Sequence, residues 1–252
     1  MTLDAVIFDW GGTLSEFVDA ELVDAWRLAA RHLDPEHEDD IATRLVRVEA
    51  DFWATTSSHQ RSATLADLLA TATRELGLDV AEALLEEAAV RHLDAWTPHI
   101  RHDPEAADAL TALRSEGLRI GMLSNTHWPR PFHERFLERD GLVDLIDARL
   151  YTSEMPFQKP HASAFLAAAE ALGVQPEHAV FVGDRPWDDI SGAQSAGMRT
   201  VLRPNPVAPD IDGIEPDARI AGLPELIGLV KAWRQPLIAT EWTRKLPISP
   251  RE

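Results

Sequence analysis

The sequence predicts an α/β protein in which a doubly wound parallel sheet carries an inserted group of four helices. Three observations lead to this fold class. The chain opens with a short apolar run that ends in an acid and two glycines. Residues 19–96 then show only helical periodicity, and after residue 104 short apolar runs alternate with helical segments. Alternation of this kind is typical of right-handed βαβ units and a parallel sheet.

The first stretch, residues 4–14 (DAVIFDWGGTL), organises the rest of the chain. Its apolar part predicts a buried strand, and its polar residues fall just past the carboxyl end of that strand. Ligands of open α/β sheets bind in the crevice beyond the carboxyl ends of the strands, so Asp9 is expected at its rim. Gly11 and Gly12 permit a sharp turn and leave room for a ligand to approach the backbone.

The helical part of the chain reads as a small bundle inserted after the first strand. Apolar residues recur at helical spacing, and Gly77 and Pro98 lie where helices end. The expected helices begin near Asp19 and then span residues 40–53, 64–76 and 80–96.

The remaining chain predicts the rest of a Rossmann-like core. Strands are expected at 119–124, 148–151, 179–183, 200–202 and, weakly, 218–220; helices are expected at 105–116, 133–139, 162–172, 190–196 and 223–233. The domain boundaries follow: residues 1–16 and 100–234 form the core, 17–99 a helical cap, and 235–252 a surface tail with three prolines.

Composition limits the possible partners. The 252 residues carry a formal net charge of −18, which argues against a nucleic-acid surface, and no apolar run is long enough to span a membrane. The absence of cysteine excludes thiol catalysis and fits a cytoplasmic protein. A small anionic substrate stays possible, because the local field at a site matters more than total charge. A monomer or a homodimer is expected.

Polar residues follow several predicted strands at the same edge of the sheet. Asp9 and Thr13 follow the first, Ser124 and Asn125 the second, and Asp184 and Asp189 a later one; Lys159 precedes a helix. Taken singly, each could serve as an ordinary turn or helix-capping residue. Together they supply a nucleophile, hydroxyl and amide donors, a cation and further acids.

The order and spacing of these residues resemble the haloacid dehalogenase-like hydrolase superfamily, in its helical-cap subclass. The matching motifs are residues 8–14 (FDWGGTL), 123–125 (LSN), 159–160 (KP) and 182–184 (VGD), with Asp189 preceding 192–198 (GAQSAGM). The resemblance implies Mg²⁺-dependent hydrolysis of a small phosphorylated metabolite through an aspartyl-phosphate.

This resemblance assigns roles to the matching residues. Asp9, Thr13 and Lys159 are expected to be catalytic, with Asp9 as the nucleophile. Substrate binding is expected from Trp10, Gly11, Gly12, Ser124 and Asn125. The Mg²⁺ ligands are expected among Asp9, a backbone oxygen near Gly11, Asp184 and Asp189, because this hard cation prefers oxygen.

One position departs from the family pattern. Phosphatases of this family carry a second Asp two residues after the nucleophile to protonate the leaving group, and here that residue is Gly11. Loss of a general acid costs about 10²–10⁴-fold in rate. Good leaving groups, such as acyl, anhydride or aryl groups, are therefore expected, unless a residue such as Glu16 or His59 replaces the acid.

Other readings of the same motifs remain open. A C–P hydrolase of the superfamily needs a cap lysine, whereas the first lysine here is Lys159. A C–halogen hydrolase needs no proton donor, yet it gives no reason for a metal ligand at Asp184. The acids could also hold Ca²⁺, and the protein could bind a phosphorylated ligand without turnover. Trp10, Trp128 and Trp187 lie near the motifs and suggest an aromatic pocket wall.

Overall fold

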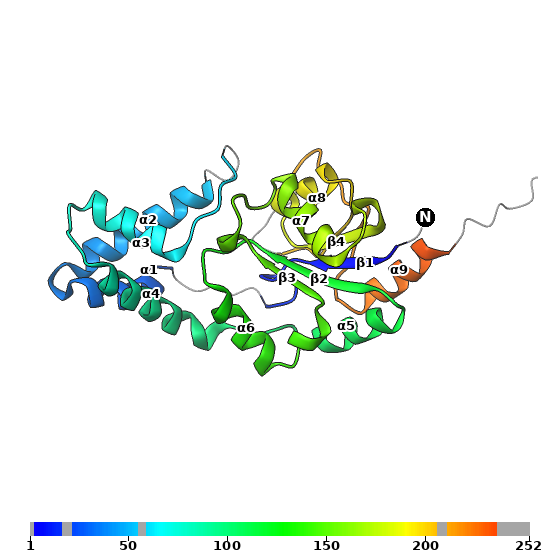
Figure 1. Ribbon diagram of the computed structural model, residues 1–252, viewed down its shortest axis with the longest axis horizontal. Coiled ribbons are helices and arrows are strands. Elements are labelled where there is room, and N and C mark those ends of the chain that lie inside the picture. The colour runs from blue at the N-terminus through cyan, green and yellow to red at the C-terminus, as the bar shows by residue number, and fades with distance from the viewer. Residues whose placement is uncertain (1–2, 17–21, 55–58, 206–210, 236–252) are drawn as a thin grey trace, which may run out of the picture.

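The computed structural model describes residues 3–16, 22–54, 59–205 and 211–235. Six parallel strands form one sheet in the order β3-β2-β1-β4-β5-β6, which confirms the predicted fold class (Figure 1). The strands are β1 (Ala5–Phe8), β2 (Arg119–Ser124), β3 (Ala148–Tyr151), β4 (Ala179–Gly183), β5 (Arg199–Leu202) and β6 (Ala218–Arg219). The order places β1 centrally, between β2 and β4.

Helices cover both faces of the sheet, and alternate residues of β1 show why. Val6 and Phe8 belong to one apolar core with residues of α5, α6 and α9, whereas Ala5 and Ile7 belong to another with residues of α7 and α8. Successive side chains of a strand point to opposite faces, so a strand buried on both sides must be apolar throughout. These helices are α5 (Ala106–Ser115), α6 (Arg130–Arg139), α7 (Ala162–Leu172), α8 (Gly192–Ser195) and α9 (Glu225–Arg234).

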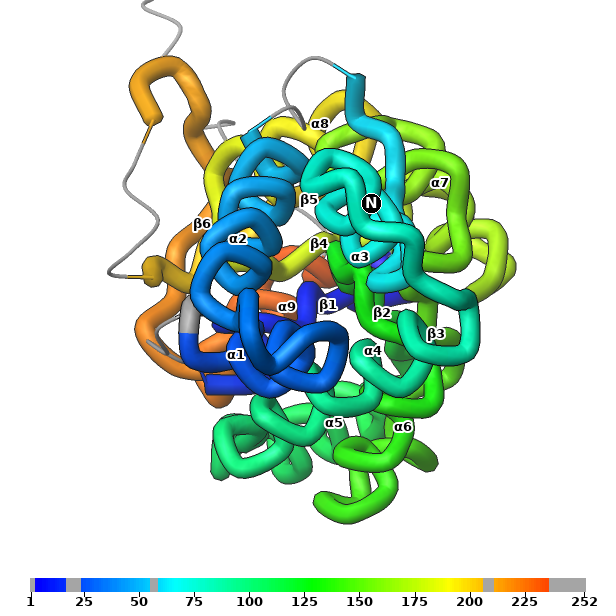
Figure 2. The backbone as a smooth tube through the Cα atoms, turned by 90° about the vertical axis from the view of Figure 1, so that its left-hand side faces the viewer, coloured from blue at the N-terminus to red at the C-terminus, as the bar shows by residue number. Residues whose placement is uncertain are grey.

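The first four helices form a separate cluster beyond the carboxyl ends of the strands (Figure 1). They are α1 (Leu22–Leu33), α2 (Glu38–Ala54), α3 (Leu65–Glu75) and α4 (Glu82–Trp96). Their apolar faces meet in a core of their own that includes Trp26, Leu45 and Leu69. Seen from the side of these helices, the strands lie behind them (Figure 2).

The two chain segments that join this cluster to the sheet run next to each other. The Asp103 N–H donates to the Leu14 carbonyl over 2.9 Å, and the Glu16 N–H donates to the Arg101 carbonyl over 2.9 Å. Arg203, just past β5, donates to the Thr13 carbonyl over 2.6 Å. The connection is therefore held against the carboxyl edge of the sheet.

Most predicted elements are confirmed, with two local differences. Residues 186–191 form a π-helix (η7, Pro186–Ser191) that precedes the short α8, where one helix over 190–196 was expected. Helix α6 begins at Arg130, earlier than expected, because Pro131 lies in its first turn, where proline is tolerated. Short 3₁₀ turns are η1 (Pro35–His37), η3 (Thr97–His99), η4 (Val143–Leu145), η5 (Thr152–Glu154) and η6 (Pro176–His178).

Two predicted segments lie partly outside the residues that the structure describes. The start of the first predicted helix, residues 19–21, and nearly all of the tail lie outside the described residues. Among the helices that are described, none combines the length and apolarity needed to cross a membrane.

Candidate active site

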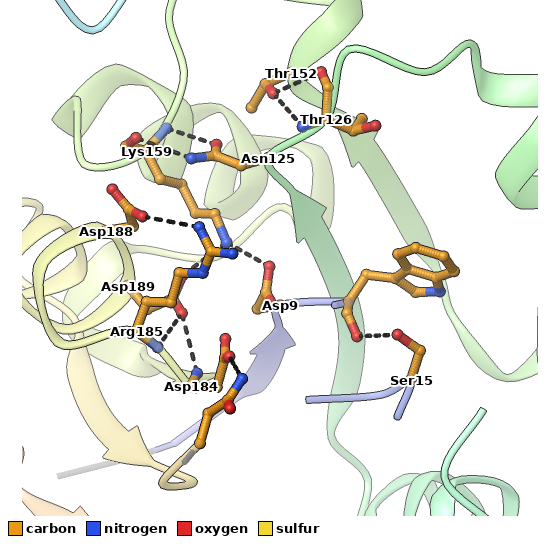
Figure 3. A network of polar contacts seen from close by, with 12 residues as sticks. Asp9, Ser15, Asn125, Thr126, Thr152, Lys159, Asp184, Arg185, Asp188 and Asp189 are labelled. Atoms are coloured by element: carbon orange, nitrogen blue, oxygen red, sulfur yellow. Dashed lines mark hydrogen bonds and ion pairs between the residues drawn. The ribbon is translucent and has the colours of Figure 1, made fainter. Parts of the chain in front are cut away.

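The carboxyl edge of the sheet brings the predicted polar residues together. Asp9 follows β1, Ser124 ends β2 and Asp184 follows β4. Lys159 reaches the same point from the segment before α7, and Asp189 from η7 (Figure 3). Asp9, Lys159, Asp184 and Asp189 are all buried, at 6%, 1%, 1% and 1% exposure.

Lys159 lies at the centre of this group. Its Nζ donates to Asp9 Oδ1 over 2.5 Å and to Asp189 Oδ1 over 2.7 Å. Burial alone would lower the pKa of Lys159, but the charges of Asp189 and Asp9 outweigh burial and raise it. The ammonium group is therefore held in its charged form against the predicted nucleophile.

Both carboxylate oxygens of Asp189 accept hydrogen bonds from neighbouring groups. Its Oδ2 accepts from the backbone N–H groups of Asp184 and Arg185, over 3.0 and 2.9 Å. A Cβ on Gly183 would lie 2.4 Å from Asp189 Cγ, so only glycine fits there. With Lys159 bonded to its other oxygen, Asp189 orients the lysine and the turn after β4, and its predicted role as a metal ligand stays a prediction.

Among the described residues, one carboxylate oxygen of Asp184 accepts a hydrogen bond and the other accepts none. Asn205 Nδ2 donates to Asp184 Oδ2 over 2.7 Å, whereas Asp184 Oδ1 is buried with no hydrogen-bond partner among the described residues. Gly12, with φ of +85°, turns beneath this carboxylate, and a Cβ there would lie 2.4 Å from Oδ2. The conformation and the contact both require glycine.

The two carboxylates nearest the ends of β1 and β4 hold protons more tightly than usual. Burial raises the pKa of Asp184 to about 8, with further contributions from the charges of Asp9 and Asp189. Burial likewise raises the pKa of Asp9 to about 6, against the opposing effect of Lys159. Buried carboxylates of this kind favour an added positive charge.

A cation could bind between these carboxylates. Among the described residues, oxygens of Asp9, Asp184 and Asp189 lie within 4.8 Å of one another. The unpartnered Asp184 Oδ1 is an oxygen donor of the type that Mg²⁺ prefers. The residues present therefore fit a small hard cation.

The predicted phosphate-binding residues differ in what they offer. Thr13 is buried, and in the described part of the chain its hydroxyl has no hydrogen-bond partner. Ser124 is buried at the end of β2. Asn125 instead bonds at both ends of its side chain to the Lys159 backbone, over 3.0 and 2.9 Å. It positions the lysine, and its role in substrate binding stays a prediction.

Gly11 has free space around it, and neither of the two residues suggested to replace the missing acid is bonded to Asp9 in the described chain. A Cβ added at Gly11 would meet no atom within 4 Å. Glu16 and His59 are both exposed, and no hydrogen bond or ion pair in the described chain joins either of them to Asp9. The structure thus offers no evidence for either as the replacement.

Two of the three tryptophans near the motifs contact the same residue, and the aromatic pocket wall suggested for all three stays a prediction. Trp10 is buried, donates from Nε1 to His102 over 3.0 Å, and packs edge-on against His133 at 4.6 Å between ring centroids. Trp128 also lies against His133, at 5.7 Å, whereas Trp187 is 41% exposed in η7. Trp10 and Trp128 therefore share a neighbour that Trp187 does not contact.

The structure adds residues that sequence reasoning missed. Arg185, next to Asp184, lies beside Asp188, with 3.6 Å between the guanidinium and carboxylate atoms, and points toward Asp9 (Figure 3). Its charge lowers the pKa of both Asp9 and Asp184 against the effect of burial. The motif itself could have indicated Arg185, but Asn205 lies 21 residues from Asp184 and no local pattern points to it.

This fold and site define a class: an α/β protein with a buried aspartate–lysine centre at the carboxyl edge of its parallel sheet. The sequence model of the haloacid dehalogenase-like hydrolases matches residues 3–197. The chain belongs to this family.

Several characterised proteins are similar to this chain. A glyceraldehyde 3-phosphate phosphatase of Methanopyrus kandleri is 31% identical over 162 residues, which are 63% of this chain and 69% of that protein. A phosphoserine phosphatase of Thermus thermophilus is 34% identical over 49% of each chain. A phosphoglycolate phosphatase of Escherichia coli K12 is 34% identical over 39% of this chain and 38% of its own. The chain thus matches half or less of the latter two proteins.

Solved structures share the whole architecture. A 2-haloacid dehalogenase from Pseudomonas syringae pv. Tomato DC3000 superposes with a TM-score of 0.70 at 26% identity, covering 92% of this chain and all of that one. A haloacid dehalogenase-like phosphatase from Thermococcus onnurineus gives a TM-score of 0.61 at 24% identity, over 90% and 98% of the two chains, and shares the fold. The chain is therefore a hydrolase whose named relatives include phosphatases.

Proposed function

We propose that this hydrolase is a Mg²⁺-dependent phosphatase that acts on a small phosphorylated metabolite through an aspartyl-phosphate on Asp9. The single observation that carries the proposal is the buried centre in which Lys159 bridges Asp9 and Asp189 beside the unpartnered oxygen of Asp184. Relatives named as phosphatases support the reaction class.

The charges at the site support a divalent cation. Four carboxyl groups face two cationic side chains there: Asp9, Asp184, Asp188 and Asp189 against Lys159 and Arg185. With all four ionised, as a bound cation would favour, two negative charges would be left to balance. We propose that Asp9, Asp184 and the Gly11 carbonyl hold Mg²⁺. When bound, this cation would offset the charge of the phosphate and that of the attacking carboxylate.

Each protein group then has a distinct task. A carboxylate oxygen of Asp9 attacks phosphorus, the new O–P bond forms, and the bond to the leaving oxygen breaks on the opposite side. Lys159 neutralises charge on the nucleophile and on the phosphoryl oxygens. The free hydroxyl of Thr13 and the hydroxyl of Ser124 donate to those oxygens. Water then cleaves the aspartyl-phosphate and releases phosphate.

The leaving group receives no proton from Gly11. We therefore propose a preference for acyl, anhydride or aryl phosphates, whose leaving oxygens accept negative charge readily. Helices α1–α4 would act as the cap, over residues 17–99, excluding water and selecting the substrate. Residues 1–16 and 100–234 would be the catalytic core, and 235–252 the tail.

A second candidate is hydrolysis of a carbon–halogen bond. It is favoured by the likeness to a 2-haloacid dehalogenase at 26% identity and by Gly11, because a departing halide needs no proton. The unpartnered Asp184 oxygen argues for the phosphatase, because it is the donor that a metal would use. A C–P hydrolase would need a lysine in the cap, and residues 17–99 contain none. A protein that binds a phosphorylated ligand without catalysis would be stabilised by that ligand and would show no turnover.

The test is steady-state hydrolysis of 4-nitrophenyl phosphate with Mg²⁺ and with a chelator. We expect turnover that requires Mg²⁺ and disappears in Asp9→Asn. Release of halide from 2-chloropropionate, without metal and without phosphatase turnover, would move the assignment to the second candidate.

A further inference from the structure

A cavity of about 320 Å³, which we call the linker cavity, lies beside one of the two chain segments that join helices α1–α4 to the sheet. Of the described residues that line it, none is expected to hold the phosphate or the cation. The linker cavity is therefore separate from the buried centre around Lys159. Its lining includes Arg101 and His102 of that segment, Arg139 at the end of α6, and the apolar side chains of Pro104, Ala107 and Leu142.

The charged side chains of the linker cavity are paired, with one exception. Asp140 accepts from Arg139 Nε and Nη2 over 2.7 and 2.6 Å, and these bonds hold the pKa of Asp140 at about 2. Asp103 accepts from Arg203, just past β5. The guanidinium of Arg101 is exposed and has no hydrogen bond or ion pair with any residue that the structure describes. One positive charge of the lining is therefore unbalanced.

His102 connects the wall of the linker cavity to the residue that follows Asp9. Its Nδ1 lies 2.6 Å from Asp140 Oδ2, and Trp10 Nε1 donates to its Nε2 over 3.0 Å. An ionised carboxylate only accepts and an indole N–H only donates, so His102 carries its proton on Nδ1. The imidazole is 3% exposed and is held from both sides. A change at the cavity wall therefore reaches Trp10 through one side chain.

Trp10 in turn holds the turn that follows the nucleophile. Its carbonyl accepts from the backbone N–H groups of Leu14 and Ser15, over 3.0 and 2.8 Å, and from Ser15 Oγ over 3.0 Å. Residues 11–13, which include the Thr13 hydroxyl proposed to bind phosphate, lie within this turn. The linker cavity and the proposed phosphate site are thus joined by a short path of hydrogen bonds.

We propose that the linker cavity binds a small molecule with one carboxylate and an apolar body, and that this ligand regulates the site at Asp9. The carboxylate accepts hydrogen bonds from Arg101, and the apolar body lies against Ala107 and Leu142. A second negative charge on the ligand would lie near Asp140 and would be repelled. Ligand pockets commonly measure about 300–1,000 Å³, so this one suits a small molecule.

The regulation follows from what the ligand would stabilise. A ligand that binds this arrangement of residues 101–103 favours it over others, including the bond from Trp10 to His102. Binding in the linker cavity and binding at Asp9 should therefore strengthen each other by the same factor. The effect on turnover rests on the proposed phosphatase function, whereas the existence of the cavity site does not.

Benzoate and benzamide test the site, because they are nearly isosteric and differ in charge. By calorimetry we expect benzoate to bind about tenfold more tightly than benzamide. Arg101→Gln should remove this difference. Arg47→Gln, at an exposed arginine of α2 outside the linker cavity, should leave it unchanged.

A spectroscopic signal locates the bound benzoate. The indole N–H resonance of Trp10, identified by its nuclear Overhauser contact with the His102 ring, should shift as benzoate is added, with the Kd that calorimetry gives. The shift should be absent in Arg101→Gln. With Mg²⁺ present, saturating benzoate should lower the Kd of inorganic phosphate by about fivefold or more, and phosphate should lower the Kd of benzoate equally. The kcat/KM for 4-nitrophenyl phosphate should rise by a similar factor.

The outcomes separate this inference from the phosphatase proposal. Equal affinity for benzoate and benzamide, or benzoate binding that persists in Arg101→Gln, would overturn the cavity site. Competition between benzoate and phosphate, or an unchanged phosphate Kd, would overturn the regulation. Benzoate binding that depends on Arg101 and shifts the Trp10 resonance, in a protein that hydrolyses no phosphate ester, would overturn only the phosphatase proposal.

Discussion

The missing general acid can be put back, because the structure leaves room for it. Gly11 is exposed, has no left-handed backbone angle, and would accept a Cβ with no atom within 4 Å. An aspartate at this position lies two residues after Asp9, beside the path of the departing oxygen. Gly11→Asp is therefore expected to fold normally and to supply the proton that the native chain does not.

The expected gain depends on the leaving group. General acid catalysis contributes about 10²–10⁴-fold, and it contributes most where the leaving oxygen is strongly basic. With Mg²⁺ present, Gly11→Asp should raise kcat/KM by about 10²-fold or more for an alkyl phosphate such as glycerol phosphate. The gain for 4-nitrophenyl phosphate should be small. Plotting log(kcat/KM) against leaving-group pKa should give a shallower slope for the variant.

Two matched variants define what would refute this reasoning. Gly11→Asn has nearly the same shape but no acidic proton, so it should give no gain on alkyl phosphates. Gly12→Ala should lose activity and about 1–3 kcal/mol of stability, because its Cβ would lie 2.4 Å from Asp184 Oδ2 at a φ of +85°. An equal gain in Gly11→Asn, or fast alkyl phosphate hydrolysis by the native chain, would contradict the missing-acid argument.

Two further predictions concern stability. Lys159→Met leaves Asp9 and Asp189 buried without their cation, so the free energy of unfolding measured in urea should fall by about 3–5 kcal/mol. Lys231→Met, at an exposed pair with Glu116, should change it by less than about 1 kcal/mol. Equal losses in the two variants would contradict the central role of Lys159. Burial lowers the pKa values of His92 and His133 to about 3 in the folded chain. Below pH 6.5 the unfolded chain therefore binds more protons than the folded chain, and the free energy of unfolding decreases as the pH is lowered. Between pH 7 and pH 5 the two histidines together should remove about 4 kcal/mol, and His92→Phe should remove about half of this dependence. Urea titrations at both pH values measure it, and an unchanged slope in His92→Phe would show that His92 is not kept neutral.

Short-range patterns were sufficient to predict much of this protein. Apolar runs, helix-ending glycines and the order of four motifs indicate the parallel sheet, the four inserted helices and the family. They also indicate which side chains gather at the carboxyl edge, because parallel strands end there together. The same local rules misplace η7, because a π-helix depends on how Asp189 must reach back to the Asp184 and Arg185 amides.

Contacts between residues far apart in the chain were decided only by the tertiary structure. Asn205 donates to Asp184 from 21 residues away, and Asn125 bonds to the Lys159 backbone from 34 residues away. Glu49 of α2 likewise lies 3.4 Å from His127, which follows β2. Sequence determined the kinds of group at the site through periodicity and spacing; the fold decided which of them pair and which stay free, because pairing depends on distances that no local pattern encodes.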